Sequence, residues 1–334
     1  MAHLTSLTSR RQVLAGLGAA AAVPLAAPAL AQGGFPNRPI RIFVPFAAGG
    51  IADITTRIVG EKLTGLIGQQ LTIMNQPGPG GMSAARQVLT ADADGYTLAL
   101  LTNGTAVSAA LYTNLQFDPV NDFVPVSTLG LFDFVFATSA TAPRQTLKEV
   151  LDYGKANPGK LNVGTILYGS TQHLSAALFK SATGIDFTHV PYRSTPDLTN
   201  GAIRGDVDLA IDSYASLGGS ITGNQLKALA VSGARRSAAL PDVPTAAEAG
   251  VADYDVTSWN AVFAPKGTPA GIVALLNQRL REAVNEPSVK ARFLELGIEA
   301  AGSSAEELGA KLKSDIAKWT AVIDKAGLQR QSFR

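Results

Sequence analysis

Short apolar runs that favour β-strands alternate with helical runs along this chain. Residues 40–44 and 71–74 have the character of strands on either side of a helix over 54–66, and a strand over 97–101 follows. Strands and helices that alternate at this spacing predict crossover connections and a mainly parallel sheet. The same alternation returns after residue 147, so the sequence predicts an α/β protein in which the pattern occurs twice.

The first 31 of the 334 residues are typical of a signal peptide. A twin-arginine pair at 10–11 precedes an apolar run rich in Ala and Gly, which closes with the small-x-small pattern Ala29-Leu30-Ala31. This pattern predicts export by the twin-arginine route, cleavage after residue 31 and a periplasmic location. A membrane anchor is the alternative, but two prolines interrupt the run and no basic cluster follows it.

About 300 residues then remain, which is more than one hydrophobic core usually supports. We expect two lobes, the first formed by residues 32–133 and 260–334 and the second by residues 134–259. An apolar run over 123–137 looks too long for one strand and is a candidate crossing between the lobes. A second run over 256–263 is the candidate return crossing.

Composition excludes several classes of function. The formal net charge of +2 comes from the two arginines of the signal peptide, so the mature chain is neutral and shows no electrostatic footprint for nucleic acid or anionic lipid. There is no cysteine, which excludes disulfides and thiolate metal sites. His173 and His189 are the two histidines beyond the leader, too few for a His-rich metal centre. We therefore expect no metal and no cofactor.

Residues 45–53, Pro-Phe-Ala-Ala-Gly-Gly-Ile-Ala-Asp, join the first strand to the first helix. Small residues at such a junction leave backbone N–H groups at the positive end of the helix dipole, a natural cradle for an anion. Asp53 fits two interpretations. It caps its own helix, or it binds a hydroxyl, an ammonium or a bridging water beside an anionic ligand.

A second cradle is predicted at residues 164–173, between a strand and a helix of the second lobe. Ser170 and Thr171 can cap the helix, offer a hydroxyl to a ligand, or do both. His173 fits a packed core position as well as a ligand contact, and Arg193 fits a solvated loop as well as a carboxylate partner. Because ligands of open α/β sheets sit at the carboxyl ends of strands, two such cradles predict a ligand-binding cleft between the lobes.

Catalysis and nucleotide binding lack support. A partial dinucleotide fingerprint lies in the leader, and no Gly-rich loop ends in Gly-Lys-Ser/Thr. Ser170 does not stand on a Gly-x-Ser-x-Gly elbow. An exported α/β hydrolase-like enzyme that acts on a small acid through Asp53, His173 or Ser170 remains an alternative, as does a partner-binding protein that has lost its ligand.

A series of short motifs resembles the Bug family of periplasmic solute-binding proteins, which are associated with tripartite tricarboxylate transporters. The motifs stand in the family's order over essentially the whole mature chain: Arg38-Pro39-Ile40, Pro45 to Gly50 with Asp53, Asn75 to Gly81, Asp94 to Leu98, Asp118-Pro119 with Asp122-Phe123, Gly169-Ser170 with His173-Leu174, Val190 to Arg193, Leu240 to Thr245 with Glu248-Ala249-Gly250, and Ala264-Pro265 with Gly267-Thr268-Pro269.

This resemblance implies a type II-like, two-lobed fold that closes by a hinge around a small carboxylate: a dicarboxylate, a tricarboxylate or an aromatic carboxylate. It implies a monomer that acts as a receptor, not an enzyme, for a membrane permease of the tripartite tricarboxylate type or for a sensor protein. With the candidates above, the predicted ligand contacts are Phe46, Ala47, Ala48, Gly49, Gly50, Asp53, Asn103, Gly104, Thr105, Thr165, Gly169, Ser170, Thr171, His173, Tyr192, Arg193, Asp212 and Ser213.

The chain departs from the family's usual pattern at three places. Ile51-Ala52 stands where Pro-Thr is frequent, Leu167 where Gly is usual, and Ala215 where Pro is common. Leu167 is bulkier and more apolar than Gly. We therefore expect a ligand with an apolar or aromatic body.

Overall fold

The computed structural model describes residues 34–252, 254–325 and 327–332. The predicted signal peptide lies outside these residues. The chain divides into two units, Met1–Phe35 and Pro36–Arg334, and the fold below is that of the second.

Ten strands form one sheet in the order β2-β1-β3-β9-β4-β7-β5-β6, with β10 and β8 also paired to β4. The strands are β1 (Ile40–Val44), β2 (Leu71–Asn75), β3 (Thr97–Thr102), β4 (Phe123–Ser139), β5 (Leu161–Ile166), β6 (Phe187–Tyr192), β7 (Leu209–Ser213), β8 (Leu226–Val231), β9 (Thr257–Pro265) and β10 (Ile298–Ala300).

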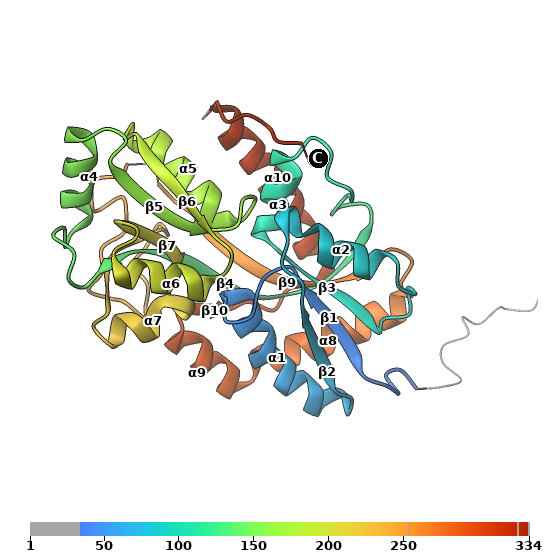
Figure 1. Ribbon diagram of the computed structural model, residues 1–334. Coiled ribbons are helices and arrows are strands. Elements are labelled where there is room, and N and C mark those ends of the chain that lie inside the picture. Colours follow the sequence, from blue (N-terminus) through green and yellow to red (C-terminus); the bar gives the residue numbers. More distant parts are fainter. Residues whose placement is uncertain (1–33, 253, 326, 333–334) are drawn as a thin grey trace, which may run out of the picture. The chain divides into compact units, whose positions relative to one another are not determined.

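The helices flank this sheet (Figure 1). They are α1 (Ile51–Ile67), the 3₁₀ turn η1 (Pro79–Gly81), α2 (Met82–Leu89), α3 (Asn103–Leu111), α4 (Leu147–Ala156), α5 (Thr171–Thr183), α6 (Thr195–Arg204), α7 (Tyr214–Thr222), α8 (Ala270–Asn285), α9 (Pro287–Glu295) and α10 (Ala305–Lys325). The predicted α/β class is confirmed.

Strand β4 joins the two halves of the sheet. Its residues 123–133 pair with β9, and its residues 134–139 pair with β7 and β8. The expectation that residues 123–137 are too long for one strand was wrong, because a single strand of 17 residues runs through both halves. We call the strands on either side of this change of partner the first half-sheet (β1, β2, β3, β9, β10) and the second half-sheet (β5, β6, β7, β8).

The pairing is mixed. The predicted parallel pairs are present among β1, β2 and β3 and again among β5, β6 and β7. Pairs that involve β4 or β9 are antiparallel. The sheet is therefore not parallel throughout. Crossover helices join the parallel strands in each half, whereas β4 and β9 run in opposite directions along each other.

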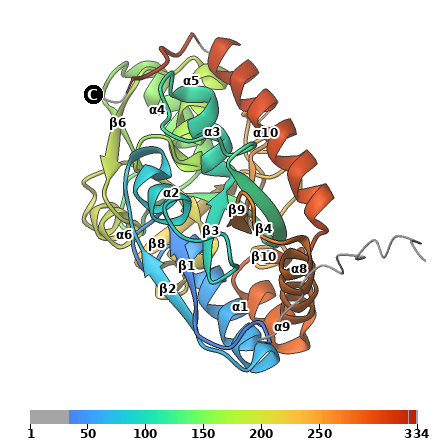
Figure 2. The ribbon, with the colours of Figure 1, turned by 90° about the vertical axis from the view of Figure 1, so that its right-hand side faces the viewer.

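Helix ends are set by local chemistry. Helix α1 ends at Gly68, which has φ 66° and so adopts the left-handed conformation that glycine tolerates best. Ser304 and Glu307 form a capping box at the start of α10: Ser304 N lies 2.8 Å from the Glu307 carboxylate, and Glu307 N lies 3.1 Å from Ser304 Oγ. Helix α10 packs against α3, and Figure 2 shows it as the long helix along one side of the first half-sheet.

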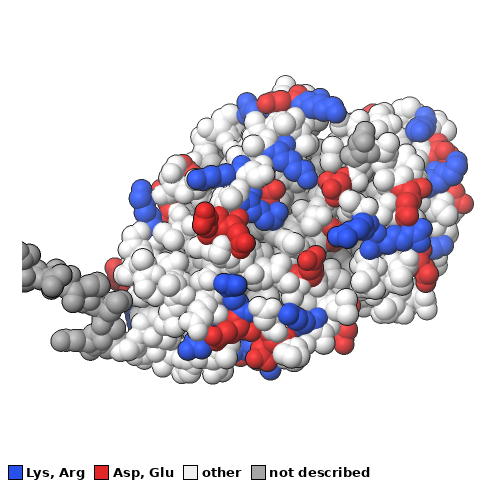
Figure 3. All heavy atoms as spheres, turned by 180° about the vertical axis from the view of Figure 1, so that it is seen from behind, with Lys and Arg blue, Asp and Glu red and all other residues white. Residues whose placement is uncertain are grey.

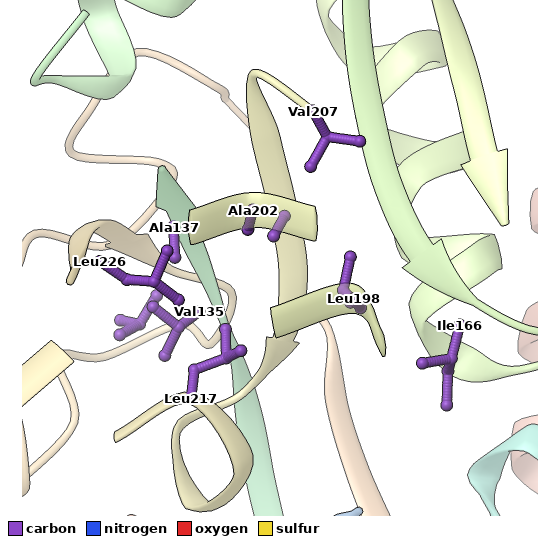
Figure 4. Close-up of a cluster of buried hydrophobic side chains, with 10 residues drawn as sticks. Val135, Ala137, Ile166, Leu198, Ala202, Val207, Leu217 and Leu226 are labelled. Carbon is purple, nitrogen blue, oxygen red and sulfur yellow. The ribbon is translucent and has the colours of Figure 1, made fainter. Parts of the chain in front are cut away.

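The core of the second half is a cluster of aliphatic side chains from β4, α6, α7 and β8 (Figure 4). Leu198 on α6 is fully buried there, and a Cβ on Gly164 of β5 would lie 2.8 Å from its side chain. The missing side chain at Gly164 thus lets α6 approach the sheet closely. Burial of each such leucine contributes about 1.5–3 kcal/mol. This packing fixes the start of α6, which lies at the candidate site.

The surface carries both signs of charge. On the face shown in Figure 3, basic and acidic side chains are interspersed. None of the helices in the described part of the chain has the length and apolar character needed to span a bilayer.

Candidate functional site

A narrow pocket lies between the two half-sheets, where the N-terminal ends of four helices meet. The space in it that is open to the centre of a water molecule is about 30 Å³, and the wider hollow, which includes part of the open solvent, is about 480 Å³. The lining residues are Phe46, Ala47, Gly50, Ile51, Ala52, Thr102, Phe132, Ile166, Leu167, Thr171, Gln172, Arg193, Ser194, Thr195, Ser258 and Asn260.

The first wall is the predicted loop 45–53. Gly49 has φ 85°, a conformation that favours glycine, and its N–H donates to the Asp53 carboxylate at 3.0 Å. Gly50 is the N-cap of α1, and within the described residues no side chain caps this end. The backbone of Gly50, Ile51 and Ala52 therefore brings the first N–H groups of a 17-residue helix to the pocket.

Asp53 is buried behind this loop and does not line the pocket. Its carboxylate also accepts from Arg57 Nε at 2.9 Å and from Asn75 Nδ2 at 3.0 Å. Burial raises the pKa of Asp53, but the hydrogen bonds from Arg57, Gly49 and Asn75 outweigh that effect and hold the pKa below its usual value. The carboxylate is thus ionised and shapes the loop.

The second cradle is the turn before α5. Gly169 has φ 80°, and Ser170 caps the helix by accepting from the N–H of His173 at 3.1 Å. The Ser170 hydroxyl in turn donates to Ile166 O at 3.2 Å. Thr171 is the predicted residue of this turn that lines the pocket.

The second cradle touches the start of α3 directly. Ser108 Oγ donates to Gly169 O at 3.1 Å, and a Cβ on Gly104 would lie 3.5 Å from Ser170 Cα. Gly104, Thr105, Gly169 and Ser170 line a second, smaller pocket that shares Phe46, Thr102 and Leu167 with the first. The two predicted cradles are therefore brought together.

Asn103 is turned toward α10. Its Nδ2 donates to Asp315 at 3.1 Å, and its Oδ1 accepts from Trp319 Nε1 at 2.7 Å and from the Thr171 hydroxyl at 3.3 Å. Both ends of the amide are occupied by protein groups. Thr105 likewise serves the capping box of α3, because its hydroxyl accepts from Thr102 N at 3.2 Å.

His173 does not line this pocket. Its ring stacks near His189 and Tyr168, with centroid distances of 4.9 and 4.7 Å. Burial, reinforced by His189, lowers the pKa of His173 to about 3, and burial lowers that of His189 to about 4. Thr165, also predicted as a ligand contact, bonds His189 Nε2 at 2.6 Å instead. This cluster is therefore neutral near pH 7.

Arg193 lines the pocket at the start of α6 and makes no ion pair within the described residues. Its neighbour Tyr192 packs against α6, close to Gly201, and lies outside the pocket. Beside Arg193, the N-cap Ser194 and the buried Thr195 complete this wall. The wall combines a helix N-terminus with a guanidinium free to pair with a carboxylate.

Asp212 is fully buried behind the pocket and organises its polar wall. Its carboxylate accepts from Gln172 Nε2 at 2.9 Å, Thr195 Oγ1 at 2.8 Å and Ser213 N at 2.7 Å. Burial raises the pKa of Asp212, although these three donors act in the opposite direction. The Ser213 hydroxyl donates a hydrogen bond to Ser216 Oγ at 2.9 Å. Asp212 and Ser213, both predicted as ligand contacts, therefore support the pocket from behind its lining.

Sequence reasoning missed several lining residues, among them Gln172, Thr195 and Asn260. Gln172 stands one position after the predicted contact Thr171, and Thr195 stands two positions after the predicted contact Arg193. Their places in the first turns of two helices could have marked them as lining residues. Asn260 stands between Trp259 and Ala261 in a buried strand, which was the signal for a buried polar function. Leu167 lies in the wall, where its bulk was expected to matter.

The described residues hold no group of three or more His, Asp or Glu side chains that could bind a metal ion. The Ser170 hydroxyl and the His173 ring are bonded to backbone groups, so they form no nucleophile–base pair. What the arrangement offers is four helix N-termini and one guanidinium around an apolar pocket, whose lining, as far as the structure describes the chain, includes no acidic side chain.

A family model described as the tripartite tricarboxylate transporter family receptor matches residues 55–328. A UPF0065 protein from a tcbD–tcbE intergenic region of Pseudomonas sp. strain P51 is 35% identical over 315 residues, 94% of each chain.

Three solved structures are similar over most of the chain. An R. palustris protein with adipate has a TM-score of 0.86 and 32% identity, covering 90% of this chain and 100% of that one. The periplasmic binding protein BugD has a TM-score of 0.85 and 31% identity, with 89% and 100% covered. MatC from Rhodopseudomonas palustris, with bound malate, has a TM-score of 0.81 and 31% identity, with 86% and 100% covered.

Proposed function

We propose, from the premise that this chain belongs to the tripartite tricarboxylate transporter receptor family, that it captures a small carboxylate in the pocket between its half-sheets. The family match confirms the resemblance to Bug proteins, and because the family consists of receptors, the chain is not an enzyme. The observation that carries the proposal is the convergence of four helix N-termini and Arg193 on the pocket. In the part of the chain that the structure describes, Arg193 has no ion-pair partner and the lining has no acidic residue.

The ligand class follows from the walls. A carboxylate would accept hydrogen bonds from the first turns of α1, α5 and α6 and pair with Arg193, whereas Phe46, Ile51, Phe132 and Leu167 offer apolar contact. Similar proteins have been solved with adipate and with malate. We propose a carboxylate with an apolar or aromatic body, since Leu167 adds apolar bulk where the two pockets meet.

Capture would occur by hinge closure of two lobes, residues 32–133 with 260–334 and residues 134–259. The contacts between Ser108 and Gly169 and between Asn103 and Thr171 would form as the lobes close. Strand β4 connects the half-sheets and is a natural hinge element. Ligand binding and closure would then be one coupled event.

We further propose that the mature protein is a periplasmic monomer, exported by the twin-arginine route after the pattern in residues 1–31. It would deliver its ligand to a permease of the tripartite tricarboxylate type or present it to a sensor protein. The similarity to the periplasmic protein BugD supports the location.

The test is calorimetry on purified residues 32–334 with succinate, malate, adipate, benzoate and 3-phenylpropionate. We expect at least one carboxylate to bind, the Arg193→Gln variant to bind it more weakly, and Lys313→Gln to bind it as the native protein does. Lys313 is exposed on α10 and does not belong to the lining set. Binding of none of these acids, or equal affinity in the Arg193→Gln variant, would contradict the proposed site.

A further inference from the structure

Asn260 is a buried polar residue in the wall of the ligand pocket. It lies on β9 with 1% of its surface exposed, between apolar neighbours, and it lines the pocket. Its Nδ2 donates to Thr55 Oγ1 at 3.1 Å and lies 3.4 Å from Ile51 O, both on α1. The amide nitrogen is thus directed at the start of α1, beside the first cradle.

The amide oxygen has no such partner. Within the described residues, Asn260 Oδ1 is the buried side-chain nitrogen or oxygen atom that receives no hydrogen bond. Buried polar atoms in folded proteins are almost always paired, so an exception in a binding pocket calls for an explanation.

The orientation of the amide is fixed by its neighbours. The Thr55 hydroxyl donates its hydrogen to Ile51 O at 2.6 Å, so the hydroxyl oxygen can only accept from Asn260. Turning the amide over would set its oxygen against two acceptors, Thr55 Oγ1 and Ile51 O. The acceptor therefore stays on the side of Asn260 that does not face α1.

We propose that Asn260 Oδ1 accepts a hydrogen bond from a hydroxyl group of the ligand, so that the preferred ligand is a hydroxy-carboxylate. This inference rests on the proposed function and adds the substrate class. The carboxylate would lie at the helix N-termini with Arg193, and the hydroxyl at β9. A protonated carboxyl is excluded as the donor at neutral pH, because carboxylic acids are ionised there.

An ammonium is a poorer donor in this position than a hydroxyl. A buried ammonium needs an anionic partner, and among the described residues no Asp or Glu lines the pocket. Asp53 is already paired with Arg57, and Asp212 lies behind Gln172 and Thr195, which occupy its oxygens. A hydroxyl meets the need of the orphan oxygen without adding charge.

The test compares matched acids by calorimetry at pH 7: malate against succinate, and 3-phenyllactate against 3-phenylpropionate, with aspartate as the ammonium counterpart. We expect the hydroxylated member of at least one pair to bind about tenfold more tightly than its deoxy counterpart. This gain in affinity should exceed the gain, if any, of aspartate over succinate. Equal or weaker binding of both hydroxy acids, while the deoxy acids bind, would overturn this inference and leave the proposed function intact. Binding of no acid would overturn both.

Two variants assign the effect to the oxygen. Asn260→Leu has a similar volume and lacks the acceptor, so the preference for the hydroxy acid should disappear while the deoxy acid still binds. Thr55→Val removes one of the two anchors on α1 and keeps Ile51 O, against which the amide oxygen cannot turn, so Oδ1 stays in place and the preference should persist. If Asn260→Leu does not fold, Asn260→Ala serves in its place. A preference that survives the loss of the amide would overturn the assignment.

Discussion

The guanidinium of Arg57 lies 2.8 Å from the carboxylate of Asp53, one turn further along α1 and directly behind the loop that forms the first wall of the pocket. This pair neutralises a buried negative charge next to a site proposed to hold an anion. Since the Asp53 carboxylate also holds Gly49 N–H, the pair links the electrostatics of the site to the shape of its backbone.

Arg57→Gln should weaken carboxylate binding about tenfold, because an unneutralised Asp53 would repel the ligand. Stability should fall by about 1–2 kcal/mol, less than for a fully buried pair, because the Arg57 side chain is half exposed. Calorimetry and urea unfolding check both effects. Lys62→Gln, the loss of one positive charge elsewhere on α1, is the control and should leave affinity unchanged.

The pair also predicts acid sensitivity of a defined sign. Because the pKa of Asp53 is lower in the folded protein than its ordinary value of 3.8, the folded state favours the ionised form. Its contribution to stability is complete above pH 3.8 and is lost as the pH falls through the folded pKa. The Asp53→Asn variant should lose this component of acid unfolding, measured by circular dichroism between pH 2 and 5.

A side chain at position 50 should leave the protein folded but weaken ligand binding. The φ of Gly50, −87°, is open to any residue, yet an added Cβ would lie 3.3 Å from Thr195 Oγ1 on the opposite wall. Gly50→Val should therefore lower affinity more than tenfold and change the melting temperature by only a few degrees. Gly65→Ala on the same helix meets no atom within 4 Å and should retain affinity while adding about 0.5–1 kcal/mol of stability.

The histidine cluster behind the second cradle should make the protein less stable in mild acid. The pKa values of His173 and His189 fall to about 3 and about 4, below the ordinary value of 6.5, so the unfolded chain binds more protons between these limits. Stability from both groups is complete above pH 6.5 and should decline by about 1.4 kcal/mol per pH unit per histidine as the pH falls toward 4.

Melting temperatures between pH 4 and 8 check this slope. His173→Gln should flatten the profile by about half, because one of the two histidines remains. A melting temperature of the native protein that does not change between pH 7 and 5 would contradict the burial of the cluster.

Asn103 shows why some of the site escapes sequence reasoning. The sequence predicts the strand over 97–101 that ends just before it, and the family resemblance implies that Asn103 lies at the cleft. Its partners Asp315 and Trp319 stand 212 and 216 residues further along the chain, and no local pattern around Asn103 indicates that these two side chains meet it. Local propensity fixes strands, caps and glycine turns; side-chain direction depends on such distant partners.

The same reasoning separates the site features that could be predicted from the sequence from those that could not. The turn glycines Gly49 and Gly169 were readable because a positive φ leaves few alternatives to glycine. The unsatisfied oxygen of Asn260 was not readable from the sequence. The amide is oriented by the groups that accept from its nitrogen, and these lie on α1, more than 200 residues earlier.

Asn103→Ala should therefore act on stability. It leaves Trp319 Nε1 without its acceptor and removes a donor from Asp315, and a buried unpaired polar group costs about 1–3 kcal/mol. Urea unfolding should show this loss, whereas carboxylate affinity should change less than in Arg193→Gln. A loss of affinity larger than that in Arg193→Gln would instead make Asn103 a direct ligand contact.

Leu167 should set the size and polarity of the ligand. Its side chain belongs to the lining of both pockets, with Phe46 and Thr102, so its removal should join the two spaces. Leu167→Gly and the less flexible Leu167→Ala should gain affinity for adipate relative to 3-phenylpropionate. The longer dicarboxylate acquires room toward the hydroxyl residues Thr105, Ser108 and Ser170 of the second pocket, while the aromatic ring loses an apolar contact. Calorimetry with both acids measures the ratio, and Leu294→Ala, an exposed leucine on α9, is the control. An unchanged ratio in both Leu167 variants would mean that the second pocket takes no part in binding.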